Sequence, residues 1–255
     1  MRRRNFRQPA APPLAPGELE YEFGVPIAGP ILERSEWATT ALKRLPEPQP
    51  LDWELVFGRP GPVVLDIGCG NGRYTIASAL ERPECNHLAI DSLPAVIRYG
   101  TRRANQRGLH HTRFAVCDGW RMLNDYCGSG SLYEIHIYHP QPYADPNKAS
   151  LRMLTPDFIG LMYDRLADGG KVVLQTDRLA YWQYIERSMS GLFDWSDVPN
   201  EWQDGPTFRS RREILARKQG LRIYRGFGVK RSGLSPEQIS AAVASIEMPV
   251  FDVEP

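Results

Sequence analysis

Short apolar runs typical of buried strands alternate with helix-type segments along most of this chain, and this alternation restricts its fold more than any other feature. The strand-type runs cover residues 63–67, 87–90, 112–117, 132–138, 171–175 and 221–229. The helix-type segments cover residues 74–80, 94–106, 156–166 and 181–189. Such alternation requires parallel strands joined by crossover helices. The sequence therefore predicts an α/β fold with a doubly wound, mostly parallel sheet, whose ligands bind beyond the carboxyl ends of the strands.

The proline distribution divides the chain into one domain and two tails. Nine of the 22 prolines fall in the first fifty residues, so residues 1–50 are expected to form a largely flexible segment with one short helix between 31 and 45. The domain itself is predicted to span residues 51–231. In residues 232–255, Ser235 and Gln238 form a capping box around Pro236, which predicts a late helix followed by a loose end.

Composition excludes several classes of protein. The chain has 31 basic and 30 acidic side chains, a net charge of +1, so a nucleic-acid site would have to be a local patch. No apolar stretch of about 18 residues exists to span a membrane, and the arginine-rich start lacks the apolar segment of a secretory signal. The four cysteines have neither CxxC nor zinc spacing, so we expect no metal site and a cytoplasmic location.

A glycine-rich loop follows the first strand of the domain and opens a helix, the context expected of a nucleotide-binding loop. Gly68, Gly70 and Gly72 permit the turn and the close approach of a ligand. A dinucleotide fingerprint would need glycine where this chain has Arg73. Asp66, just before the loop, would repel a pyrophosphate but suits the ammonium and sulfonium groups of S-adenosylmethionine. The alternative is a glycine turn that merely packs a helix on a strand.

Two further aspartates end neighbouring strands. Asp91 closes the second strand, where a carboxylate can accept both ribose hydroxyl protons of a bound nucleoside. Asp118 ends the third strand and is predicted to accept from the adenine amino group. An aspartate at a strand end also caps turns, so this structural role is the alternative for Asp118.

The order of several motifs resembles that of the bacterial tRNA (guanine-N7-)-methyltransferases. The chain carries Leu51-Asp52-Trp53 with Phe57-Gly58, then the glycine loop, then Thr176-Asp177 with Tyr181, then Ser210-Arg211-Arg212-Glu213 with Ala216 and Gly220. The resemblance covers residues 51–231 and implies a class I methyltransferase fold, S-adenosylmethionine as cofactor and a tRNA guanine as acceptor. It also implies that Asp66, Asp91 and Asp118 contact the cofactor, while Asp177, Ser210, Arg211 and Glu213 hold the substrate.

After the fourth strand the family carries an aspartate between two prolines, whereas this chain has Gln141 between Pro140 and Pro142. Guanine N7 has an in-plane lone pair, so it attacks a methyl group without prior removal of a proton, and the enzyme mainly has to orient it. A glutamine accepts from guanine N1–H and donates to O6. Gln141 is therefore the predicted catalytic residue. His139 is an alternative base if the acceptor is an exocyclic amine.

A basic segment follows the late substrate motif. Residues 206–231 contain nine arginines and lysines against one acid, which predicts a phosphate-binding stripe, the alternative being a solvated charged face. The arginines at positions 2, 3, 4 and 7 would add a flexible second arm.

These features together predict a monomeric, cytoplasmic enzyme that methylates N7 of a guanine in tRNA from S-adenosylmethionine, with no membrane or metal partner. Two alternatives remain open. One is a methyltransferase for another RNA or for a small molecule, and the other is a non-catalytic protein that binds S-adenosylmethionine and RNA.

Overall fold

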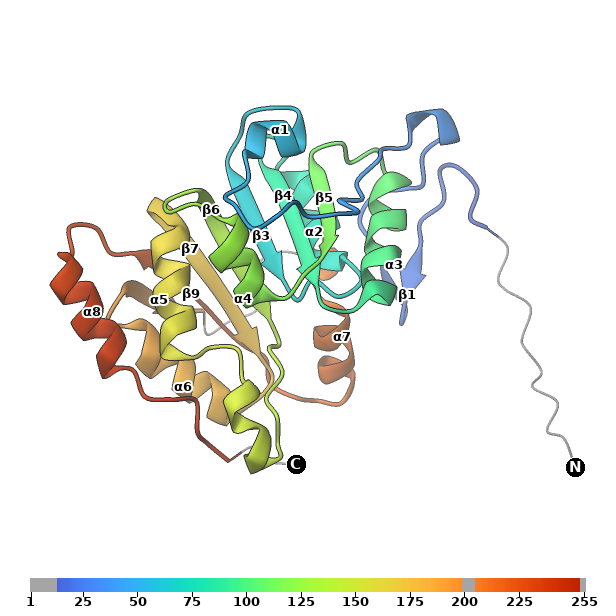
Figure 1. Ribbon diagram of the computed structural model, residues 1–255. Helices are drawn as coiled ribbons and strands as arrows, with labels where there is room; N and C mark the ends of the chain where they lie inside the picture. Colours follow the sequence, from blue (N-terminus) through green and yellow to red (C-terminus); the bar gives the residue numbers. More distant parts are fainter. Residues whose placement is uncertain (1–12, 199–204, 253–255) are drawn as a thin grey trace, which may run out of the picture.

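The computed structural model describes residues 13–198 and 205–252 and contains one seven-stranded sheet (Figure 1). Its strand order is β5-β4-β3-β6-β7-β9-β8. The strands are β3 (Val63–Ile67), β4 (Asn86–Asp91), β5 (Thr112–Val116), β6 (Leu132–Tyr138), β7 (Leu166–Thr176), β8 (Phe193–Asp197) and β9 (Tyr224–Lys230). Strands β3 to β7 pair in parallel, and β9 is antiparallel to both of its neighbours. The predicted doubly wound, mostly parallel sheet is confirmed.

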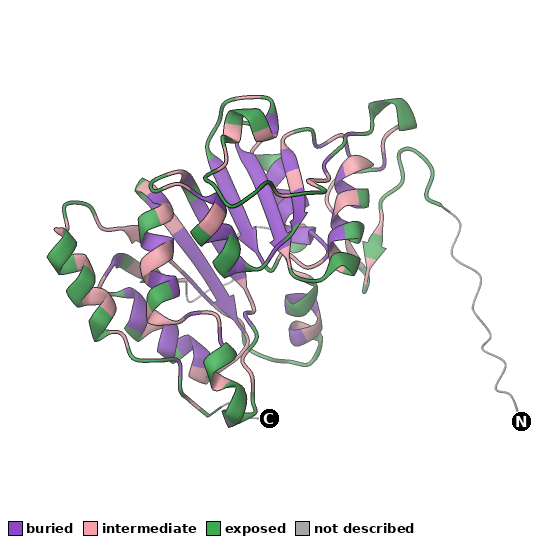
Figure 2. Cartoon of the chain, in the orientation of Figure 1, coloured by how far each residue is buried: buried purple, intermediate pink, exposed green. Residues whose placement is uncertain are grey.

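Helices cover both faces of this sheet. The helices of the described residues are α1 (Trp53–Phe57), α2 (Arg73–Glu81), α3 (Pro94–Asn105), α4 (Gly119–Arg121), α5 (Pro156–Arg165), α6 (Leu179–Met189), α7 (Arg211–Lys218) and α8 (Pro236–Ser245). Side chains alternate between the faces of a strand, and in β4 Ala89 packs with apolar residues of α2 and α3, whereas Leu88 and Ile90 join the larger core under α5 and α6. All five residues of β3 are buried, as expected for a central parallel strand (Figure 2).

The segment before the domain differs from the expectation of a loose linker. Residues 13–50 contain the paired strands β1 (Tyr21–Glu22) and β2 (Val25–Pro26), and Ile27 and Ile31 are almost fully buried. Apolar side chains at these positions find a place in the core, which the high proline content does not prevent. Residues 1–12, with the predicted arginine arm, lie outside the described residues.

The short helix predicted between residues 31 and 45 is wrong, because only a 3-10 turn, η1 (Arg34–Glu36), forms there. The chain then runs beside the edge strand β5, where Phe114 donates to the Thr40 carbonyl at 2.8 Å and accepts from the Leu42 amide at 2.9 Å. Pairing with exposed backbone groups of an edge strand satisfies their hydrogen bonds, and this tertiary contact outweighs the weak helical signal.

Several elements were not expected from the sequence. These are β8, α1, α4 and α7, the π-helical turn η2 (Met122–Tyr126) and the 3-10 turns η3 (Pro146–Leu151) and η4 (Pro206–Phe208). The capping box formed by Ser235 and Gln238 does begin α8, as predicted. The four cysteines are free thiols. No helix of the described residues is both long enough and apolar enough to cross a bilayer.

Candidate functional site

A cavity of about 640 Å³ lies at the carboxyl ends of β3 and β6, where the strand order reverses direction. We call it the glycine-loop cavity. It is lined by the glycine loop (Gly68, Cys69, Gly70, Asn71), by Glu22 and Asp66, by α2 (Arg73, Tyr74), by α3 (Ala95, Val96, Tyr99, Arg103), by the end of β6 (Tyr138, His139) and by α7 with its N-cap (Ser210, Arg211, Arg212, Leu215). Helix α7 lies beyond the arrowheads of β3 and β4 in Figure 1. Segments far apart in sequence therefore meet at one edge of the sheet.

The three glycines of the loop have two different roles. Gly68 and Gly70 have φ angles of 74° and 54°, and a Cβ built on either would meet no atom within 4 Å. They therefore border open space and leave room for a ligand to approach the backbone. Gly72 does not line the cavity; a Cβ there would lie 2.9 Å from the Phe114 ring and 3.2 Å from Gly100. Its predicted ligand contact stays a prediction, and its evident role is close helix packing.

Two carboxylates, Asp91 and Asp66, lie next to the loop. Asp91 accepts from the Gly70 amide at 3.1 Å and from the Leu93 amide at 2.9 Å. Asp66 is 3% exposed and accepts a hydrogen bond from the Thr75 hydroxyl. Burial, aided by the charge of Asp91 and opposed by the Thr75 hydrogen bond, raises the pKa of Asp66 to about 7. A cation placed in the cavity beside Asp66 would favour the ionised form of its carboxyl group.

Asp118 stands apart from this group. Its carboxylate accepts from the Arg121 amide at 2.9 Å and so caps α4, the alternative that its strand-end position allows. Like Asp91, it is not among the residues that line the glycine-loop cavity. Its contact with adenine stays a prediction.

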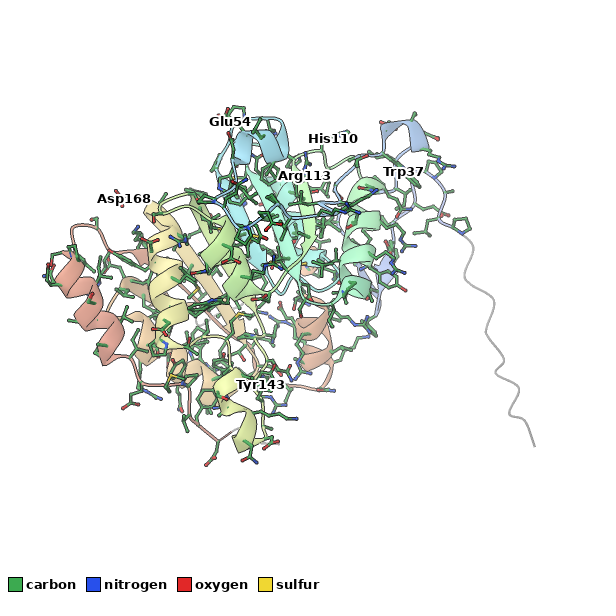
Figure 3. All side chains as sticks on the ribbon, in the orientation of Figure 1. Trp37, Glu54, His110, Arg113, Tyr143 and Asp168 are labelled. Carbon is green, nitrogen blue, oxygen red and sulfur yellow. The ribbon has the colours of Figure 1, made fainter. Side chains whose placement is uncertain are left out.

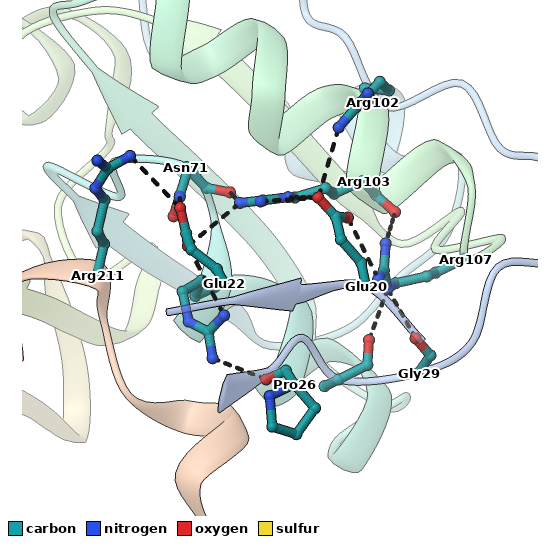
Figure 4. Close-up of polar contacts among 11 residues, drawn as sticks. Glu20, Glu22, Pro26, Gly29, Asn71, Arg102, Arg103, Arg107 and Arg211 are labelled. Carbon is teal, nitrogen blue, oxygen red and sulfur yellow. Dashed lines mark hydrogen bonds and ion pairs between the residues drawn. The ribbon is translucent and has the colours of Figure 1, made fainter. Parts of the chain in front are cut away.

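The N-terminal hairpin β1–β2 brings Glu22 to the wall of the cavity, and Figure 4 shows its polar contacts. Glu22 accepts two hydrogen bonds of 2.9 Å from the Asn71 amide group and lies 3.5 Å from Arg211 and 3.8 Å from both Arg73 and Arg103. Sequence reasoning missed this wall. The signal that could have revealed it is the alternation of glutamate with apolar or aromatic residues from Glu18 to Phe23, which is typical of a strand.

The segment after β6 contains a strained turn. His139 and Tyr143 have φ angles of 54° and 44°, which are rare for residues with a side chain. His139 Nδ1 lies 2.9 Å from Asp177, and its Nε2 lies 2.8 Å from the Gln175 amide nitrogen. Because both ring nitrogens have protein partners, His139 is not free to act as a base, which disfavours the amine-acceptor alternative.

Gln141 lies between these two strained residues. Its side chain is exposed, has no hydrogen-bond partner among the described residues and does not line the glycine-loop cavity. The amide group therefore has no protein partner that a ligand would have to displace. Its predicted catalytic role is untested by these contacts.

The predicted substrate residues divide into two pairs. Ser210 and Arg211 line the cavity, and Ser210 also caps α7 by accepting from the Glu213 amide at 3.1 Å. Asp177 and Glu213 are bound to other protein groups instead. Burial would raise the pKa of Asp177, but hydrogen bonds from His139 and Arg212 hold it well below its usual range. Asp177 thus links the strained turn after β6 to α7 through Arg212.

The predicted phosphate stripe is not a continuous free face. Glu213 lies within 4 Å of Arg209, Arg217 and Arg225, while Arg231 pairs with Asp194 and Lys230 donates to the Leu166 carbonyl. These contacts therefore engage five of the nine basic side chains of the segment within the protein. His136 and His139 also have separate partners, and no group of three or more potential metal ligands occurs among the residues that the structure describes.

Comparison with known proteins assigns the family. A family model described as a putative methyltransferase matches residues 60–225. The Bordetella pertussis protein named tRNA (guanine-N(7)-)-methyltransferase is 30% identical over 183 residues, which cover 70% of each chain. This chain belongs to the tRNA (guanine-N7-)-methyltransferase family. The resemblance predicted from the motifs is confirmed.

Another member of this methyltransferase family, from Mycolicibacterium gilvum, is 33% identical over 147 residues, or 54% of each chain. Among solved structures, a 16S rRNA (adenine(1408)-N(1))-methyltransferase from Catenulisporales acidiphilia, crystallised with S-adenosylmethionine, aligns with a TM-score of 0.50. The alignment covers 73% of this chain and 94% of that one at 14% identity, so it supports the fold alone.

Proposed function

We propose that this protein transfers a methyl group from S-adenosylmethionine to N7 of a guanine in tRNA. The observation that carries the proposal is the glycine-loop cavity, where the predicted cofactor residues Asp66, Gly68 and Gly70 meet Ser210 and Arg211 of the late substrate motif. Membership of a family whose curated members are named for this reaction supports it. As part of the proposal, the enzyme works in the cytoplasm as a monomer, with tRNA as its partner.

The residues of the cavity fit this cofactor. Asp66 supplies negative charge for an ammonium group, and Arg73 and Arg103 line the same cavity and suit a carboxylate. The open space beside Gly68 and Gly70 leaves room for the methionine part. When bound, S-adenosylmethionine supplies an electrophilic methyl group on a positively charged sulfur.

The protein's own task is then to orient the acceptor and exclude water. Attack by guanine N7 needs no base, which agrees with the occupied ring nitrogens of His139. Tyr74 and Tyr138 line the cavity with their rings 4.7 Å apart and edge to face, so the wall beneath the acceptor is aromatic. Positioning by such a wall supports the transfer reaction without acid–base chemistry.

The raised pKa of Asp66 predicts pH-dependent cofactor binding. A cationic ligand binds the charged carboxylate, and in the free protein Asp66 is increasingly protonated below about pH 7. The affinity for S-adenosylmethionine should therefore fall as the pH drops from 7.5 to 5.5, by up to about tenfold per pH unit. Calorimetry in buffers of different ionisation enthalpy should detect proton release on binding at pH 6.5. Asp66→Asn should bind more weakly and independently of pH, while equal wild-type affinity at both ends of this range would contradict the role.

The hydrogen bond that Asp91 accepts from the glycine loop predicts a larger loss of affinity. Asp91→Ala removes the acceptor for the Gly70 amide as well as the expected acceptor for two ribose hydroxyls. Binding of S-adenosylmethionine should weaken by about 10- to 150-fold, measured by calorimetry. Asp157→Ala, an exposed aspartate at the start of α5, is the matched control and should bind normally. Wild-type affinity in Asp91→Ala would remove Asp91 from the cofactor site.

A direct assay separates the proposed function from its alternatives. The purified protein is incubated with S-adenosylmethionine and unmodified tRNA, and the nucleosides are then identified by mass. We expect N7-methylguanosine. Transfer only to other RNA or to metabolites would support the first alternative. Binding of both ligands without any transfer would support the non-catalytic protein.

A further inference from the structure

Helix α3 separates the glycine-loop cavity from a second cavity of similar volume, about 640 Å³. Ala95, Tyr99 and Arg103 line the first, spaced by one helical turn, whereas Ile97 and Arg98 face the second. We call the second cavity the α3 groove, and it lies between α3, the edge strand β5 and residues 37–45. Neither the family motifs nor the proposed reaction assigns a ligand to it.

The floor of the α3 groove is apolar. Leu42, Ile97, Phe114 and Val116 line it, and Val116 on β5 is 47% exposed. The segment that runs along β5 pairs with Phe114 through Thr40 and Leu42, which leaves the Val116 end of the strand uncovered. A concave apolar floor with one exposed end is typical of a binding surface.

The walls of the α3 groove carry positive charge only. Lys43, Arg98, Arg102 and Arg121 line it, and its lining contains no acidic residue. Arg102 lies 3.5 Å from Glu20 and Arg121 lies 3.6 Å from Asp125, while Lys43 and Arg98 have no ion-pair partner in the described part of the chain. In a chain of net charge +1, this local excess calls for an anionic ligand.

Trp37 offers a preorganised aromatic face at one end of the groove. Its indole N–H donates to the Leu32 carbonyl at 2.9 Å, which fixes the ring, yet the side chain is 38% exposed. Figure 3 labels it beside the N-terminal segment, near the end of α3 where the Ala38 amide donates to the Asn105 carbonyl. A fixed and exposed indole is suited to stacking with a base.

The groove extends along the helix toward the proposed active site. From Pro94 to Asn105, α3 is about 16 Å long at a rise of 1.5 Å per residue. The Trp37 end lies at Asn105, and the other end, with Pro94, Val116 and Arg121, lies at the carboxyl edge of the sheet. The glycine-loop cavity opens at this same edge, so a chain-like ligand could occupy both cavities at once.

We propose that the α3 groove binds a short single-stranded segment of the RNA substrate next to the acceptor guanine, with phosphates on Lys43, Arg98 and Arg121 and a base stacked on Trp37. This inference rests on the proposed function. Cations lie toward both ends of the groove, with Arg121 at one and Arg102 nearer the other, which matches the repeated charge of a nucleic acid. A fatty acid, with a single charged end, fits this distribution less well.

The test measures RNA binding and kinetics in groove variants of the full-length protein. Arg98→Glu and Trp37→Ala should raise both the Kd and the KM for unmodified tRNA by about tenfold or more, with kcat and the affinity for S-adenosylmethionine nearly unchanged. Trp37→Phe should retain most of the affinity because the stacking face remains. Arg187→Glu, which reverses an exposed charge on α6, is the matched control and should behave like the wild type.

Ultraviolet crosslinking of the wild-type protein to unmodified tRNA provides a readout that no folding defect can mimic, and the peptide containing Trp37 should carry a nucleotide. Methylation of tRNA by the wild type together with an unchanged KM in Arg98→Glu would overturn the role of the α3 groove in RNA binding, while leaving the proposed function intact. If tRNA binding depends on the groove residues but no methyl group is transferred, RNA binding by the α3 groove is supported and the proposed function is rejected. Crosslinking to free nucleoside monophosphates but not to tRNA would also overturn the inference, in favour of a small anionic ligand.

Discussion

Replacing Glu213 with alanine is expected to lower the free energy of unfolding by about 3–5 kcal/mol, because it removes a buried carboxylate that pairs with a buried arginine. Glu213 is 1% exposed, and its carboxylate lies 3.3 Å from Arg225, which is itself only 7% exposed. It also accepts hydrogen bonds of 2.9 Å from Arg217 and 3.0 Å from Gln175. Urea denaturation followed by circular dichroism measures the loss.

Two comparisons test the cause of this effect. Glu47→Ala, an exposed glutamate, should leave the urea midpoint unchanged, while Arg225→Met added to Glu213→Ala should recover part of the lost stability. Burial opposes the charge of Glu213, but Arg225, Gln175 and Arg217 together lower its pKa. The stability that ionised Glu213 contributes should therefore be fully present above its ordinary pKa of 4.5. It should be lost as the pH falls from there through the lower pKa of the folded protein. A wild-type midpoint in Glu213→Ala at pH 7 would contradict this account.

The sheet and the cofactor end of the site could be predicted because their signals are local. The buried run Val63–Ile67 has no polar residue except Asp66, and the glycines that follow it can adopt the positive φ angles of the loop. Strand, loop and helix are neighbours in sequence here, so the local residue pattern is enough to predict how they are arranged. The same holds for the capping box that begins α8.

The rest of the site depends on contacts between distant residues, which composition does not encode. Glu20 and Glu22 meet Arg103 more than 80 residues away, and this contact turns a proline-rich segment into a wall of the cavity. The basic segment has a large excess of arginine in the sequence, but Glu213 gathers three of these arginines in the fold. The sequence gives the charges, and only the tertiary structure decides which of them face solvent.

Gln141→Ala is expected to reduce methyl transfer to tRNA by about 10- to 1000-fold, since a small displacement of N7 spoils its approach to the methyl group. Gln141 lies on the turn bracketed by His139 and Tyr143, both with positive φ, and strained backbone of this kind is often concentrated at active sites. Its amide has no hydrogen-bond partner among the described residues, so it is free to accept from guanine N1–H and donate to O6. Single-turnover methylation of unmodified tRNA measures the rate.

Two further substitutions decide whether Gln141 orients the guanine. Gln141→Asp should keep or raise the activity, because a carboxylate accepts from both N1–H and N2–H of guanine while losing one bond to O6. Ser150→Ala, at an exposed position of η3, is the matched control and should transfer at the wild-type rate. The affinity for S-adenosylmethionine should change less than turnover in Gln141→Ala. If Gln141→Ala is as active as the wild type, orientation must come from the aromatic wall of Tyr74 and Tyr138 instead, because those rings already line the cavity where N7 would meet the methyl group.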